Sequence, residues 1–223
     1  MKDAPNFNRL AGLYLWMEVL TFGPFLARCR NAFPQQAAGR RRALVLGDGD
    51  GRFTARLLRG NVEIRVDAVD ASAAMLASLR RRAVPNEGRV RVHLADVRVW
   101  EPERLEDSEP YDLVASHFFL DCLTEAEVQA LATRIFSSVC PGAVWVISDF
   151  AIPQGWFGRL VARPLVWLLY RAFGVLTGLE VGALPDHGRA LSEAGFVLAE
   201  RKRFLGGLLV SELWSAREHS TEN

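Results

Sequence analysis

The stretch LVLGDGDGRF, Leu44–Phe53, decides the fold class of this chain. A short apolar run ends in three glycines that alternate with two aspartates, and the helix-forming segment Arg52–Gly60 follows directly. Glycine loops between a strand and a helix usually bind phosphate, because bare backbone N–H groups at a helix start attract anions. Two carboxylates in such a loop oppose that use, so their charge limits which ligand the loop can hold.

From this loop outward, strand-like and helix-like patterns alternate. The expected helices are Arg52–Gly60, Ala71–Ala83 with Ser72 as N-cap, and Thr124–Val139 opened by the capping box of Thr124 and Glu127. The expected strands are Ala43–Gly47, Glu63–Asp70, Arg89–Asp96, Tyr111–Phe119 and, after a turn at Pro-Gly, the run that starts at Cys140 and ends at Phe150. Such alternation predicts βαβ units and a parallel sheet.

Further patterns flank this core. Helices are expected within Asn8–Phe33, Trp156–Thr177 and Asp186–Phe196, and a closing hairpin is expected from Phe196–Phe204 and Gly207–Trp214. No repeat or linker is visible, so residues 1–223 are expected to form a single domain. Residues 1–40 would form an N-terminal helical lid, residues 41–150 the cofactor-binding core, and residues 151–223 the lid helices and the hairpin.

Composition excludes several classes of function. A formal net charge of +1 argues against a general nucleic-acid binder. The three cysteines form no CxxC pair and the four histidines lack ligand spacing, so no metal site is expected. Buried free thiols would suit a cytoplasmic protein. Charged residues and prolines interrupt the apolar stretches Leu10–Ala27 and Leu160–Leu176, which leaves peripheral contact with a membrane open but disfavours spanning.

The aspartates of the loop favour a cationic ligand. Two unit charges at about 5 Å and an effective dielectric near 20 interact by about 3 kcal/mol. For Asp48 and Asp50 that interaction repels a pyrophosphate and attracts a cation. S-adenosylmethionine is a phosphate-free nucleoside with a sulfonium and an ammonium group, so it suits both a nucleotide-binding loop and the negative charge in that loop. Alternatively, both aspartates face solvent and the glycines only shape a turn.

Two further acids follow predicted strands. Asp70 lies about 20 residues past the loop at a strand end, where a carboxylate can accept hydrogen bonds from ribose hydroxyls. Alternatively, Asp70 is the N-cap of the next helix. Asp96 ends the third strand and can accept from an adenine amino group, or it is a turn aspartate.

The segments LVLGDGDGRF, VDAVDASAAML, LADV, YDLVASHFFLDCL and CPGAVWVISDF resemble, in order and spacing, the motifs of class I S-adenosylmethionine-dependent methyltransferases. The resemblance covers Arg42–Phe150. It implies a three-layer α/β sandwich with a seven-stranded, mostly parallel sheet of order 3-2-1-4-5-7-6, one antiparallel strand, and lid helices at the N-terminus and after strand five. It also implies S-adenosylmethionine as cofactor, bound by Gly47, Asp48, Gly49, Asp50, Gly51, Asp70, Ala71, Met75, Asp96, Val97, Ser116 and His117.

The chain departs from the family at the loop. Val45 stands where the family often has an acid, and Asp48 replaces the usual small residue between the first two glycines. We infer from this that Asp48 or Asp50 takes over part of the electrostatic role of the missing acid.

The acceptor is less well defined by the sequence. Aromatic and apolar residues fill the expected lid segments, which suits a small hydrophobic or aromatic acceptor, although such residues also build cores. The segment from Leu169 to Phe196 is loosely similar to methyltransferases of ubiquinone and menaquinone biosynthesis. Candidate substrate-pocket residues are Tyr14, Phe118, Asp121, Trp156 and Tyr170.

His117 is the candidate catalytic base at the end of the fourth strand, or else a packed histidine. Methyl transfer by in-line displacement needs alignment above all, and a base only where the acceptor must lose a proton. Two other functions stay open: a nicotinamide-dependent oxidoreductase on a Rossmann fold, and a cofactor-binding protein without catalysis. The basic runs at residues 39–42 and 80–82 are typical of solvated helix ends, so a nucleic-acid substrate is disfavoured.

Overall fold

The computed structural model describes residue 22 and residues 24–102, 109–168, 171 and 184–217. The strands are β1 (Arg42–Leu46), β2 (Arg65–Asp70), β3 (Val90–Leu94), β4 (Tyr111–His117), β5 (Val139–Phe150), β6 (Phe196–Phe204) and β7 (Leu209–Ala216). The α-helices are α2 (Pro24–Arg30), α3 (Arg52–Gly60), α4 (Ala73–Ala83), α5 (Glu125–Phe136) and α7 (His187–Ala194). Short turns of helix are η2 (Pro34–Ala37), η3 (Val84–Arg89), η4 (Leu120–Cys122) and η6 (Leu205–Gly207), and a helix with a π turn, η5 (Gly158–Ala162), runs through residues 156–168.

The seven strands form one sheet of order β3-β2-β1-β4-β5-β7-β6, which confirms the predicted topology. β1 pairs in parallel with both β2 and β4, and β4 pairs in parallel with β5. β7 runs antiparallel to its neighbours β5 and β6. Strand order therefore reverses between β1 and β4, and in open parallel sheets ligands bind beyond the carboxyl ends of the strands at such a point.

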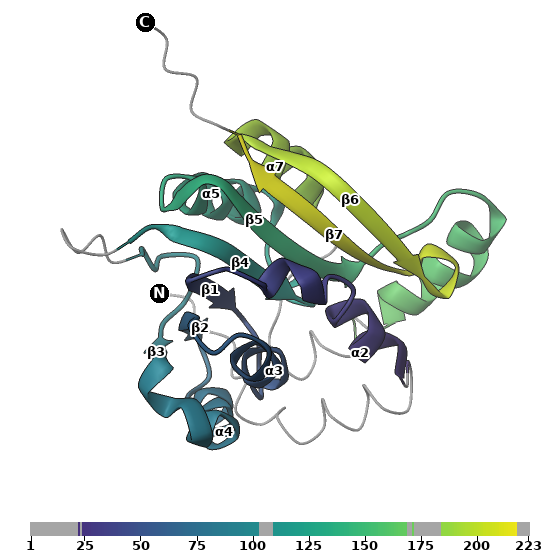
Figure 1. Cartoon of the computed structure of the whole chain (residues 1–223). Coiled ribbons are helices and arrows are strands. Elements are labelled where there is room, and N and C mark those ends of the chain that lie inside the picture. The colour runs from purple at the N-terminus through teal and green to yellow at the C-terminus, as the bar shows by residue number, and fades with distance from the viewer. Residues whose placement is uncertain (1–21, 23, 103–108, 169–170, 172–183, 218–223) are drawn as a thin grey trace, which may run out of the picture.

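Helices cover both faces of the sheet, which confirms the three-layer arrangement. Figure 1 shows α5 and α7 together on one face and α3 and α4 on the other. The first layer packs on the sheet through a cluster that includes Trp145, Leu131 and Leu191, each at most 1% exposed. The second packs through a cluster that includes Leu58 and Val45. The helix-forming spacing noted in the sequence thus corresponds to the buried side of each helix.

A third cluster joins α2, the helix after β5 and the hairpin of β6 and β7. Its buried members include Leu26, Ala162, Val166 and Leu209. This cluster holds α2 and the helix after β5 against the end of the sheet formed by β5, β6 and β7. Within the described residues no helix is long and apolar enough to cross a bilayer.

Local signals in the sequence located several helix ends. Ser72 caps α4 by accepting from the N–H of Met75, and Thr124 forms the predicted capping box with Glu127. Gly195 ends α7 in the left-handed region at φ 110°.

Two expectations need correction. Pro141 and Gly142 do not precede β5. They form an irregularity inside it, because Val139 already pairs with Tyr111 before the register shifts; proline cannot donate to a ladder and is confined to such bulges or edges. The three cysteines are free as predicted, but only Cys29 is fully buried, since Cys122 and Cys140 lie in half-buried positions.

Candidate functional site

The loop Gly47–Gly51 connects β1 to α3 at the point where strand order reverses. Gly47, Gly49 and Gly51 all have positive φ angles, of 62°, 60° and 81°. The N–H of Gly47 donates to the carbonyl of Val69 on β2, at 2.9 Å, and this bond holds the loop against the neighbouring strand. A run of left-handed residues turns backbone N–H groups toward one side, which builds a cradle for a polar ligand.

The glycines of the loop meet different surroundings. A Cβ atom at Gly51 would lie 2.6 Å from the Cα of Leu79 on α4, so the backbone itself excludes a side chain there. At Gly47 a Cβ would lie 2.2 Å from the ring of Phe119. At Gly49 the nearest atom would be the Met75 sulfur, at 3.8 Å. The first and third glycines are therefore required for packing, and the middle one leaves space in front of the loop.

Asp48 bonds to the start of α3. Its carboxylate accepts from the N–H groups of Phe53, at 3.2 Å, and Thr54, at 2.8 Å. Burial raises the pKa of Asp48, and these backbone bonds and the charge of Arg30 lower it in part. Neither the cation-attracting role nor the solvent-facing alternative describes this contact, because the carboxylate satisfies the orphan donors of a helix N-terminus.

Asp50 is paired with two arginines. Its Oδ2 lies 3.0 Å from Nε of Arg52 and 2.7 Å from Nη2 of Arg82 on α4. These cations compensate the charge of Asp50, so its attraction for a ligand cation is weaker than its bare charge implies. The pairing also ties the loop to α4.

Asp70, at the end of β2, supplies the second carboxylate of the crevice. It accepts from the N–H of Ser72, at 2.8 Å, and from the N–H of Gly49. The pKa of Asp70 is raised to about 6. Burial is the main cause, the two backbone bonds act in the opposite direction, and the nearby charge of Asp48 adds to the effect of burial. Asp48 and Asp70 are therefore the two carboxylates that interact across the loop, and a nearby cation would offset their mutual repulsion.

The predicted adenine-side residues lie beyond β3. Asp96 forms a two-pronged ion pair with Arg98, with Nε at 2.9 Å from both carboxylate oxygens, and it accepts from the N–H of Arg98 at 3.0 Å. Hydrogen bonds from Arg98 hold the pKa of Asp96 below its ordinary value. Val97 is buried and its carbonyl accepts from Arg134, at 2.6 Å. Asp96 thus has the contacts of a turn aspartate, while Ala71 is exposed at the crevice rim.

Ser116 and His117 end β4 and point to opposite faces of the sheet, as neighbours on a strand do. Ser116 accepts from the indole N–H of Trp145, at 3.0 Å, on the α5 side. The His117 ring packs against Phe53 of α3, with ring centroids 4.4 Å apart. Only His117 therefore turns its side chain toward the α3 side of the crevice.

His117 is held in a buried polar network. Its Nδ1 lies 3.0 Å from the Ser148 hydroxyl, which donates to the carbonyl of Cys29 at 3.2 Å and lies 3.0 Å from the Ser211 hydroxyl. Nε2 of His117 is buried and has no hydrogen-bond partner among the described residues. Burial, and next the charge of Arg30, hold the pKa of His117 well below its ordinary value. The imidazole is thus neutral, with one ring nitrogen fixed and the other without a partner.

The loop after β4 contains a strained aromatic residue. Phe118 has a φ of 53° although it is not glycine, and its ring is 9% exposed. The ring lies 5.5 Å from that of Phe150 at the end of β5, and the Arg30 guanidinium lies 5.8 Å from its centroid. Bulky residues rarely adopt this backbone conformation, and where they do the strain often coincides with a functional site.

A buried carboxyl pair lies beside Phe118. Asp149, 1% exposed, accepts from the N–H groups of Asp121, at 3.2 Å, and Phe150, at 2.9 Å. The Asp121 and Asp149 side chains also hydrogen-bond to each other. Burial, and next the charge of Asp121, raise the pKa of Asp149 well above its ordinary value. Two carboxyls this close share a proton and titrate as a pair.

The structure brings together only part of the predicted substrate pocket. Phe118 and Asp121 share the loop after β4, whereas the Trp156 side chain is 72% exposed. Tyr14 and Tyr170 lie outside the described residues.

Sequence reasoning missed Asp149 and Phe119. Asp149 could have been found, because an acid that ends an apolar strand is the same signal that pointed to Asp70. Phe119 could not, because nothing in its spacing predicts that its ring covers Gly47.

The core of the chain is similar to known methyltransferases. Residues 43–142 match the family model described as a methyltransferase domain. A trans-aconitate 2-methyltransferase from Methylobacterium radiotolerans is 32% identical over 130 residues, which cover 57% of this chain and 46% of that protein. The chain thus spans less than half the length of this curated relative.

Solved structures share the fold. An O-methyltransferase family protein from Burkholderia thailandensis aligns with a TM-score of 0.68 at 17% identity, over 96% of this chain and 61% of the other. The N-methyltransferase NodS from Bradyrhizobium japonicum, in complex with S-adenosylhomocysteine, aligns with a TM-score of 0.60 at 14% identity, over 87% and 85%. At these identities the likeness concerns the fold.

Proposed function

Because this chain carries the methyltransferase domain of the class I S-adenosylmethionine-dependent family, with S-adenosylmethionine as its cofactor, we propose that it methylates a small hydrophobic or aromatic acceptor. The observation that carries the proposal is the glycine loop at the switch point, where the Asp70 carboxylate accepts from the N–H of Gly49 and interacts with the charge of Asp48. This arrangement fits a cationic, phosphate-free nucleoside better than a dinucleotide, whose pyrophosphate these carboxylates would repel.

The residues of the crevice fit the cofactor in two respects. Gly49 leaves open space in front of the loop, and Asp70 can accept from ribose hydroxyls. When bound, S-adenosylmethionine supplies an electrophilic methyl carbon, and in-line attack by the acceptor releases S-adenosylhomocysteine as a neutral thioether. The chain's own contribution is to align the acceptor and to exclude water.

The aromatic residues after β4 and β5 support an apolar or aromatic acceptor. Phe118 and Phe150 lie at the carboxyl ends of neighbouring strands, and Phe22 lies 5.3 Å from Phe150 between ring centroids. Flat rings of this kind favour stacked or edge contacts with another ring. The strained backbone of Phe118 aims its ring into this cluster, so we assign it to positioning the acceptor.

The lowered pKa of His117 limits its role as a base. The acceptor of an O- or N-methylation loses a proton as the new bond forms, and that proton must pass to a base or to water. A neutral Nε2 can accept a hydrogen bond from the acceptor, but burial and Arg30 disfavour the imidazolium. We therefore propose that His117 accepts a hydrogen bond from the acceptor and orients it, and that the released proton passes to water.

The first experiment measures binding. Calorimetry with S-adenosylhomocysteine, S-adenosylmethionine and NAD should give binding by the first two alone. Tight binding of NAD with none of S-adenosylhomocysteine would overturn the assignment in favour of the oxidoreductase alternative.

The second experiment measures transfer. Methyl-tritiated S-adenosylmethionine is incubated with the protein and either lipid or polar-metabolite extracts, and label is expected in the lipid pool. Label confined to the polar pool would refute the hydrophobic acceptor. Cofactor binding with no label in either pool would favour the binding protein without catalysis.

A matched pair of variants tests the role of Phe118. Phe118→Leu should slow transfer with little change in cofactor affinity, because it removes the ring and keeps the apolar volume. Phe136→Leu is the control, since Phe136 packs on Phe196 against the other sheet face. Equal slowing in both variants would contradict a positioning role for Phe118.

A further inference from the structure

The segment that follows β5 exposes an unusual amount of apolar surface. Trp156, Leu160, Trp167 and Leu168 are 72%, 71%, 60% and 60% exposed, and Ile152 and Val161 add to them. Elsewhere in the described chain the exposed large apolar residues are isolated: Val62, Val84, Leu94, Val99 and Val197. Scattered apolar residues are ordinary on protein surfaces, whereas a contiguous patch marks an interaction site.

The apolar residues lie on the outer side of the helix. Gly158, Ala162 and Val166 recur every four residues, are buried, and face the protein, where the last two join the third cluster. Trp156, Leu160, Arg163 and Trp167 follow at intervals of four, three and four residues, which brings them to a shared, exposed side. The helix is therefore apolar on both sides, although only one side has a partner within the described residues.

Positive charge borders this outer side. No acidic residue occurs between Asp149 and Glu180, while Arg159, Arg163 and Arg171 fall within that stretch. Within the described residues Arg159 and Arg163 form no ion pair. The guanidinium of Arg171 lies 5.7 Å from the centre of the Trp167 ring. The exposed side thus combines indole rings, leucines and arginines, of which Arg159 and Arg163 form no ion pair with the described part of the chain.

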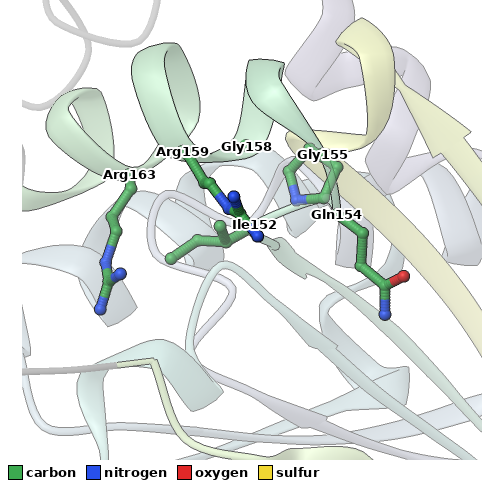
Figure 2. Close-up of a pocket in the computed structure, with 7 residues that line it drawn as sticks. Ile152, Gln154, Gly155, Gly158, Arg159 and Arg163 are labelled. Carbon is green, nitrogen blue, oxygen red and sulfur yellow. The ribbon is translucent and has the colours of Figure 1, made fainter.

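Arg159 and Arg163 line a hollow. An open pocket of about 530 Å³ is lined by Ile152, Pro153, Gln154, Gly155, Gly158, Arg159 and Arg163. Figure 2 shows the side chains of Arg159 and Arg163 extending from the same side of the helix, with Ile152 reaching between them. Guanidinium groups match the oxygens of phosphate, so this hollow suits an anionic head group beside an apolar surface.

We propose that residues 152–168 dock on the surface of a lipid bilayer that contains anionic phospholipid. Trp156, Leu160 and Trp167 enter the boundary between head groups and acyl chains, and Arg159 and Arg163 contact lipid phosphates. An interfacial helix is defined by this combination of aromatic and aliphatic residues with cations at the edge.

Charge favours a bilayer over a second copy of the chain. A two-fold contact through this face would bring the arginines of both copies together with no acid from the segment to compensate them. An anionic bilayer supplies that compensation.

Vesicle co-sedimentation tests the proposal. The full-length protein, without cofactor or acceptor, is spun with vesicles of phosphatidylcholine alone or of phosphatidylcholine with phosphatidylglycerol. The protein should pellet with the mixed vesicles and less with the neutral ones, and added salt should weaken the binding. Because no methyl transfer is involved, failure here leaves the proposed methyltransferase activity standing, and failure of that activity leaves the docking surface standing.

Matched double variants locate the surface. Trp156→Ser with Trp167→Ser should lower the partition coefficient roughly tenfold or more, because the variant lacks the two aromatic side chains that enter the bilayer. The control is Val62→Ser with Val99→Ser, at residues 77% and 78% exposed, and it should bind as the wild type does. Arg159→Gln with Arg163→Gln should abolish the preference for anionic lipid, while Arg56→Gln with Arg59→Gln on exposed positions of α3 should not.

All changed side chains are exposed, so circular dichroism and melting curves should show that each variant folds. Wild-type protein that pellets with neither vesicle would overturn the proposal. Equal binding by the tryptophan variant and its valine control would also overturn it. So would a dimer in solution that the tryptophan variant abolishes while vesicle binding is absent, because a second copy would then occupy this face.

Discussion

The crevice around Gly47–Gly51 and the segment of residues 152–168 differ in how their chemistry is satisfied. In the crevice each carboxylate bonds to a nearby backbone or arginine, and two of the three glycines fit tightly against their neighbours. Residues 152–168 instead expose apolar rings and arginines whose partners are not among the described residues. The polar groups of the crevice are thus satisfied within the chain, whereas residues 152–168 present groups that an external partner could satisfy.

The largest expected effect tests how tightly the crevice is built. Gly51→Ala and Gly39→Ala both place a side chain at positive φ, 81° and 72°, but only Gly51 would clash, with the Cα of Leu79 at 2.6 Å. Gly39→Ala should cost about 1 kcal/mol of unfolding free energy. Gly51→Ala should cost about 3 kcal/mol or more, because backbone must move. Denaturant titration measures both, and equal costs would show that the loop has room.

Next in size is the loss of the Asp70 carboxylate. Asp70→Asn should weaken cofactor binding roughly tenfold to a hundredfold, the value of a hydrogen bond to a charged group. Asp112→Asn is the control, because Asp112 bonds to the N–H groups of Arg41 and Arg42 at the start of β1, away from the crevice. Calorimetry of both variants checks this, and a similar loss in each would break the assignment.

The same substitution should stabilise the unliganded protein. The pKa of Asp70 is raised to about 6 in the folded protein. The contribution of this carboxyl to the free energy of unfolding is therefore fully present below its unfolded pKa near 4, and it is lost as the pH rises through about 6. Asp70→Asn removes that penalty and should raise the unfolding free energy above pH 7 by about 1–2 kcal/mol. A loss of stability at that pH would mean that the carboxylate is needed for folding.

The pH dependence of binding gives an effect of similar size. Because the ionised carboxylate accepts hydrogen bonds from a ribose, wild-type affinity should fall about tenfold from pH 7 to pH 5 as Asp70 takes up its proton. In Asp70→Asn the curve should be flatter, with the remainder due to Asp48, whose pKa is also raised. Identical curves would assign the titration to another group.

The smallest effects separate the two aspartates of the loop. Asp48→Asn should change the unfolding free energy by about 1 kcal/mol or less, because the weaker bonds to the start of α3 and the relief of a buried charge with a raised pKa oppose each other. Asp50→Asn should change it by less than about 0.5 kcal/mol, because its ion pairs with Arg52 and Arg82 are partly exposed. In calorimetry both should weaken cofactor binding, and Asp48→Asn more strongly. Unchanged affinity in both variants would refute the electrostatic hypothesis for this loop.

Patterns that act over short distances were predictable from the sequence. The bounds of α3, the Ser72 cap, the capping box at Thr124 and the strand order all followed from spacing, capping residues and the family resemblance. Partners distant in sequence were not: Arg82 reaches Asp50 from another helix, and Asp149 at the end of β5 meets Asp121 in η4. The sequence gives the residue types at such sites, while three-dimensional proximity decides which of them neutralise one another.

The absence of a side chain at Gly158 sets the direction of the helix after β5. A Cβ at Gly158 would lie 1.6 Å from the carbonyl oxygen of Pro153, so the first turn of the helix rests directly on the chain that leaves the sheet. A methyl group added at this position would force the helix to tilt away from the segment at Pro153. The packing of Gly158 on Pro153 therefore determines how the helix presents Trp156 and Trp167 to its surroundings.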